Sequence, residues 1–138
     1  MKIEKFVELL KKDLEKEYSS AIQYINCAAL MRGSACGEII GELKRKANQE
    51  IEHAMILAEQ IHYLGGNLNV KVDADLEEQD NDGLLEQDLN TEKDSINRYK
   101  LRIQQAEELK EISLANHLRE ILASEQTHTD ELMHTLGK

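Results

Sequence analysis

The sequence predicts an all-α protein: a single four-helix bundle over residues 1–138, in which two antiparallel helical hairpins are joined by a long crossover. Apolar residues recur every three or four positions in four separate segments, which is the spacing of one face of a helix. The chain has no proline and is rich in Leu, Ile, Ala, Glu, Lys and Gln, a composition that favours helices over strands. Its length suits one domain with one core.

Four helices are expected, at residues 3–33, 37–65, 82–109 and 112–136. Glycines separate the first two helices and end the second, because glycine readily interrupts a helix. The last two helices meet near Leu109–Ser113, where the chain has no glycine. The crossover, residues 66–81, is rich in Asp, Asn and Gly. Its roughly 16 residues reach about 50 Å when extended, and a helix of about 28 residues is about 42 Å long. The crossover can therefore run the length of the bundle.

Each apolar stripe carries a glutamate near its midpoint. Burying an isolated carboxylate in the core of a bundle is costly or forces the group to take up a proton. Four glutamates at one depth, one on each helix, instead predict a bound cation. They are Glu17, Glu50, Glu92 and Glu125.

An internal repeat places these glutamates in two equivalent halves. Glu-x-x-His occurs at Glu50/His53 and again at Glu125/His128, and a further glutamate lies 33 residues before each pair. Around that further glutamate, the pattern Asp-Leu-x-x-Glu-x-x-Ser-x-x-x-Tyr also occurs twice, 75 residues apart. Two similar hairpins packed about a pseudo-twofold axis bring both half-sites to one point. The predicted metal ligands are Glu17, Glu50, His53, Glu92, Glu125 and His128.

The ligand types indicate which metal such a site prefers. Residues three apart share a helix face, so each Glu-x-x-His presents a carboxylate and an imidazole together. Carboxylates with some imidazole suit iron or manganese, and the lack of thiolates argues against a structural zinc site. Four carboxylates balance the charge of two divalent ions. We therefore expect two iron ions per chain, with manganese or zinc able to take their place in vitro, and a reaction between Fe(II) and an oxidant.

At these residues the sequence resembles the ferritin-like di-iron superfamily, and bacterioferritin most closely, over nearly the whole chain. The resemblance implies a ferroxidase that oxidises Fe(II) with O2 or H2O2, works in a homo-oligomer and serves iron storage or detoxification. It also implies that Glu17 and Glu92 are terminal ligands and that Glu50 and Glu125 bridge the ions. Tyr24 matches a tyrosine beside the family's di-iron centre and joins the six ligands as an expected catalytic residue.

The sequence departs from bacterioferritin at several positions. Ile51 stands where that family has its haem-ligating methionine, so we expect no haem. Arg45 and Gln49 stand where acidic or histidine residues help iron to reach the cavity of the cage, and the family's short fifth helix has no counterpart.

The alternative function is that of a di-iron peroxidase or oxidase similar to rubrerythrin, without mineral storage. The chain lacks a rubredoxin-type Cys-x-x-Cys, and Ser95 stands where such sites often add a glutamate.

Other features narrow the location, the partners and the residues that support the site. The net charge of −10 argues against nucleic acid or an anionic membrane as a partner. An amphipathic N-terminus and the lack of a membrane-spanning run predict a cytoplasmic protein, in which Cys27 and Cys36 are reduced thiols.

Asp13 and Asp88 precede ligand glutamates by one turn and are candidate hydrogen-bond partners of the ligand histidines. Asp88 is the stronger candidate, because Asp13 lies beside a lysine cluster that indicates an exposed position.

Overall fold

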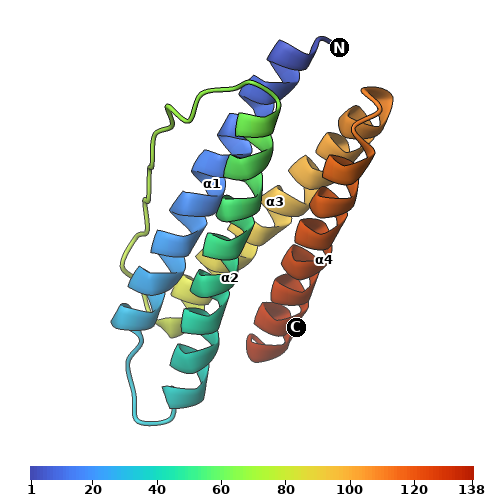
Figure 1. Cartoon of the computed structure of the whole chain (residues 1–138). Coiled ribbons are helices and arrows are strands. Elements are labelled where there is room, and N and C mark those ends of the chain that lie inside the picture. The colour runs from blue at the N-terminus through green and yellow to red at the C-terminus, as the bar shows by residue number, and fades with distance from the viewer.

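The computed structural model describes residues 1–138 as an all-α four-helix bundle, which confirms the predicted fold (Figure 1). The first two helices form one antiparallel hairpin, the last two form another, and a long crossover descends along the outside of the first hairpin. No helix combines the length and apolar character needed to cross a bilayer. The helices are α1 (Ile3–Leu30), α2 (Gly37–Tyr63), α3 (Asn81–Glu108) and α4 (Ile112–Thr135).

Specific contacts end the first helices slightly earlier than the sequence predicts. Helix α1 ends at Leu30 rather than at residue 33, and the side chain of Asn81, the first residue of α3, bonds both the backbone N–H and the carbonyl of Arg32. Helix α2 ends at Tyr63 rather than at residue 65. Gly65 then adopts a φ of +85°, a conformation that favours glycine.

The turn between α3 and α4 forms without glycine. Lys110 adopts a φ of +61° there, in the left-handed region that non-glycine residues visit rarely. The backbone N–H of Glu111 donates to the carbonyl of Ala106, which satisfies one of the free carbonyls at the end of α3. At the other end of α3, the Asp80 carboxylate caps the helix by accepting from the N–H of Gly83 at 2.8 Å.

Two apolar clusters fill the two ends of the bundle and leave a polar layer between them. One cluster surrounds Phe6 and Leu57 near the N-terminus, and the other surrounds Leu43 and Leu89 at the opposite end. Burial of each large aliphatic side chain stabilises the fold by about 2 kcal/mol. The layer between the clusters contains the four glutamates on which the sequence analysis centred.

Candidate metal centre

Each helix contributes one buried glutamate to the polar layer, and α2 and α4 each add a histidine one turn further along. The structure brings all six predicted ligands together, with exposed fractions between 0% and 7%. Their ligand atoms form two groups, in each of which all atoms lie within 4.8 Å of one another. Glu50 and Glu125 belong to both groups. We call the first group, which adds Glu17 and His53, the Glu17–His53 subsite, and the second, which adds Glu92 and His128, the Glu92–His128 subsite.

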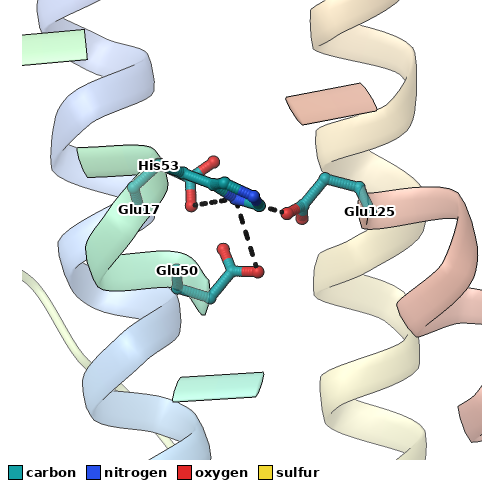
Figure 2. Close-up of side chains that lie close together, drawn as sticks. All are labelled: Glu17, Glu50, His53 and Glu125. Carbon is teal, nitrogen blue, oxygen red and sulfur yellow. Dashed lines mark ion pairs between the residues drawn. The ribbon is translucent and has the colours of Figure 1, made fainter. Parts of the chain in front are cut away.

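The histidines reach from one hairpin to the other. In the Glu17–His53 subsite (Figure 2), Nδ1 of His53 lies 3.0 Å from the Glu125 carboxylate and 3.6 Å from that of Glu17. In the Glu92–His128 subsite, Nδ1 of His128 lies 3.1 Å from the Glu50 carboxylate and 3.5 Å from that of Glu92. The same atom of each ring therefore faces carboxylates from both halves, as the pseudo-twofold repeat predicts.

Most atoms of this cluster have no hydrogen-bond partner, although they are buried. Buried polar groups are almost always hydrogen-bonded, so a concentration of such atoms at one point needs an explanation. Carboxylate oxygens with imidazole nitrogen are suitable ligands for iron or manganese, and two divalent cations would satisfy all of them. The unpartnered atoms are Oε2 of Glu17, Oε2 of Glu92, both carboxylate oxygens of Glu50 and of Glu125, and Nδ1 of His53 and of His128.

Without a cation, the cluster retains protons. Burial raises the pKa of Glu50 and of Glu125 well above the ordinary value, and the nearby charge of Glu17 raises both further. Burial lowers the pKa of His53, but the carboxylates of Glu125 and Glu17 outweigh it and raise that pKa to about 10. A cation that binds here must displace these protons, because metals bind the deprotonated forms of carboxylate and imidazole.

Two buried tyrosines hydrogen-bond Glu17 and Glu92, the two glutamates that are not shared between the subsites. The Tyr24 hydroxyl on α1 donates to Oε1 of Glu92 at 2.6 Å, and the Tyr99 hydroxyl on α3 donates to Oε1 of Glu17 at 2.5 Å. Burial raises the pKa of both phenols, and the facing carboxylates raise it further, so both remain protonated donors. Each glutamate then keeps its second oxygen, Oε2, unpartnered within the cluster.

The two aspartates do not play the part that the sequence suggested. Asp13 is fully buried rather than exposed, and it accepts from Arg98 and Arg102. Asp88 is also buried and accepts from Nε2 of Gln23 at 3.0 Å. Neither aspartate contacts a histidine. Both lie on the inward face of their helices. Asp13 is buried despite the neighbouring lysines because Arg98 and the buried Arg102 of α3 pair with its carboxylate.

A glutamine, which the sequence did not predict, contacts a histidine instead. Oε1 of Gln49 lies 2.5 Å from Nε2 of His128. The burial of Lys46 on α2 was not predicted either, and its ammonium donates to Glu131 on α4 at 2.6 Å. A glutamine directly before a ligand and a lysine one turn before it are the only signals in the sequence, and both residue types are common on exposed helix faces.

Asp88 makes the stability of the metal-free protein depend on pH. Burial raises the pKa of Asp88 to about 7, so between about pH 4 and pH 7 the folded chain keeps a proton that the unfolded chain releases. Stability from this group is therefore full below pH 4 and is lost as the pH rises to 7. We expect Asp88→Asn to stabilise the metal-free protein by about 3 kcal/mol at pH 8 and hardly at all near pH 4. Urea unfolding across this range tests it, and equal effects at both pH values would contradict it.

A four-helix bundle whose centre holds four glutamates and two histidines in two overlapping groups is typical of carboxylate-rich metal-binding proteins. The ferritin-like domain family matches residues 7–138, and the chain belongs to that family. The predicted resemblance to the ferritin-like di-iron superfamily, near bacterioferritin, is thereby confirmed. No curated protein matches the sequence significantly.

Solved structures share the fold over almost the whole chain. A ferritin-like, diiron-carboxylate protein from Bacillus anthracis has 30% sequence identity and a TM-score of 0.92, with 99% of each chain covered. BfrA from M. tuberculosis has 26% identity and a TM-score of 0.88, covering 96% of this chain and 83% of its own. The dodecameric thioferritin of Bacteroides fragilis, a bacterioferritin-related protein, has 24% identity and a TM-score of 0.87, covering 99% and 87%.

Proposed function

We propose that the protein is a ferroxidase, which binds two Fe(II) ions as substrate in the centre of the bundle and oxidises them to Fe(III) with O2 or H2O2. A role in iron storage or detoxification follows from that activity. The observation that carries the proposal is the set of buried, unpartnered carboxylate and imidazole atoms in two overlapping groups. The ligands would be Glu17, Glu50, His53, Glu92, Glu125 and His128.

The side chains have distinct parts in this reaction. Glu50 and Glu125 lie in both groups, so their carboxylates are placed to bridge the two ions. Nδ1 of His53 and of His128 supplies one nitrogen to each subsite. Tyr24 and Tyr99 orient the remaining glutamates through their hydroxyls. Iron held at these residues supplies the electrons, one from each Fe(II), that reduce the oxidant. The apolar clusters on both sides limit the access of water to the reacting ions.

The proposal includes a homo-oligomer and no haem. Large apolar side chains are exposed on the outer face of the α1–α2 hairpin, including Ile25, Ile51 and Met55. An exposed apolar face of this kind is typical of a protein–protein contact. Ile51 lines a groove on this face at the position of the haem-ligating methionine of bacterioferritin, and its side chain has no atom that can ligate iron.

A di-iron peroxidase or oxidase without mineral storage is the second candidate. It is favoured by the α2–α4 surface beside the centre, where Arg45 and Lys46 both pair with Glu131. Cations on this surface oppose the passage of Fe(II) from the centre to a mineral core. Iron uptake far beyond two ions per chain supports storage, and repeated turnover without accumulation supports the peroxidase or oxidase.

Titration of metal-free protein with Fe(II), followed by ultraviolet absorbance with and without O2, tests the ferroxidase proposal. We expect rapid oxidation that saturates near two irons per chain and falls at least about 100-fold in the variant Glu50→Gln/Glu125→Gln. The control is Glu52→Gln/Glu120→Gln, which makes the same change of charge at exposed positions of α2 and α4. Unchanged oxidation in the first variant would refute the assigned centre.

A further inference from the structure

The two halves of the metal centre follow one plan, but the residues around them differ. The 75-residue offset that relates the ligands pairs Gln49 on α2 with Ser124 on α4, and Gln23 on α1 with Arg98 on α3. The repeat of the ligands alone predicts two equivalent subsites. The different residues at these neighbouring positions make the two subsites unequal.

In the Glu92–His128 subsite, the histidine is held in the form that binds metal. Oε1 of Gln49 lies 2.5 Å from Nε2 of His128 and also accepts from Nη1 of Arg45 at 3.3 Å. A guanidinium can only donate hydrogen bonds, so it selects the oxygen of the Gln49 amide rather than the nitrogen. That oxygen can only accept, so Nε2 of His128 carries the hydrogen. In the neutral ring the free electron pair then lies on Nδ1, which faces Glu50 and Glu92.

Arg45 is itself fixed in place. Its Nη2 donates to Glu131 on α4 at 2.7 Å, and the same carboxylate oxygen accepts from the buried Lys46. A continuous chain of hydrogen bonds thus connects the surface to the ring of His128. Such outer partners of a metal-binding histidine fix its tautomer and orientation.

His53, in the other subsite, has no such partner. Ser124 occupies the position that corresponds to Gln49, and no side chain bonds Nε2 of His53. The ion-pair contacts of the ring are all at Nδ1, which faces the carboxylates of Glu125, Glu17 and Glu50 at 3.0, 3.6 and 3.9 Å. Nδ1 is also the atom that would face the cation, so no hydrogen bond elsewhere on the ring fixes its tautomer.

We propose that the two subsites fill in a fixed order, the Glu92–His128 subsite first and the Glu17–His53 subsite second, and that Gln49 is the positioning residue that sets this order. The inference rests on the proposed two-metal centre. It assigns the two ions different roles, because the ion beside His128 is retained while the ion beside His53 exchanges more readily.

Binding of Co(II), a spectroscopically visible divalent ion, to the metal-free full-length protein tests the order. We expect two transitions by calorimetry and visible absorbance, with the first at least about tenfold tighter than the second. Crystals grown with one equivalent of Co(II) should show anomalous scattering beside His128 and little beside His53. One transition of two equal ions, or a first ion beside His53, would overturn the order while leaving the ferroxidase proposal intact. No binding at all would overturn both.

Variants of Gln49 separate positioning from a structural role. Gln49→Leu removes the acceptor and should weaken the first transition about 10- to 100-fold, bringing it close to the second. Gln49→Glu, whose carboxylate also accepts from His128 and Arg45, should restore it. Ser124→Ala, at the corresponding position of the other half, should change neither transition. The inference fails if Gln49→Leu leaves the first transition unchanged, or if Gln49→Leu and Gln49→Glu weaken it equally.

Discussion

Replacing Glu50 and Glu125 together by glutamine is expected to make the metal-free protein more stable, by about 3 kcal/mol at pH 7.5. Burial raises the pKa of both carboxyls well above the ordinary value. Above the ordinary glutamate pKa, the unfolded chain releases protons that the folded chain keeps, so stability falls as the pH rises. Glutamine has nearly the same shape and does not titrate, so it avoids this loss.

Urea unfolding of the metal-free proteins at pH 5 and pH 7.5 measures the effect. The gain should be large at pH 7.5 and small at pH 5, where the unfolded chain also holds most of its protons. The exposed control, Glu52→Gln/Glu120→Gln, should be within about 0.5 kcal/mol of the wild type at both pH values. A variant that is less stable than the wild type at pH 7.5 would show that the buried carboxyls support the fold.

Addition of a divalent cation should reverse the ranking. A ligand that binds only the folded state stabilises it by about 4 kcal/mol at 1,000 times its dissociation constant. The wild type has the ligands for this gain and the glutamine variant lacks the two that both subsites share. The centre would thus lower the stability of the empty protein and raise that of the loaded one, which is the expected behaviour of side chains arranged for binding rather than for folding.

The fold and the position of the centre could be predicted from the sequence for one physical reason. Apolar periodicity specifies which face of each helix is buried, and a charged residue on that face stands out against it. Glu17 and Glu92 are examples, because both interrupt aliphatic stripes at the same depth. The offset of 75 residues then relates the two halves without any knowledge of how the helices pack.

The surroundings of the centre could not be predicted in the same way. Gln49, Lys46 and Arg102 are polar residues of types that usually face solvent, and no periodicity distinguishes the buried ones from the exposed ones. Their burial depends on which helices meet at that point, as when α4 supplies Glu131 to Lys46. Residue spacing also gave no reason to expect that two arginines would surround Asp13 while a neutral glutamine faces Asp88.

Removal of the Asp13 carboxylate is expected to destabilise the protein by about 3–5 kcal/mol, because it leaves the buried guanidinium of Arg102 without a counter-charge and leaves Arg98 paired only with Asp94. Asp13 is fully buried and accepts from Nη1 of Arg98 and from Nε and Nη2 of Arg102. Only 6% of the Arg102 side chain is exposed, so water cannot replace the lost partner.

Urea unfolding of Asp13→Ala and Asp88→Ala gives a matched comparison, because the two residues occupy corresponding positions in the repeat. At pH 5, where the folded chain keeps the Asp88 proton, Asp88→Ala leaves no cation behind, since Asp88 accepts from Gln23, and we expect a loss of less than about 2 kcal/mol. The double variant Asp13→Ala/Arg102→Leu should recover part of the stability that Asp13→Ala loses, because it removes the stranded charge as well as its partner. Equal losses for the two aspartates, or no recovery in the double variant, would mean that Asp13 acts by filling space rather than by neutralising Arg102.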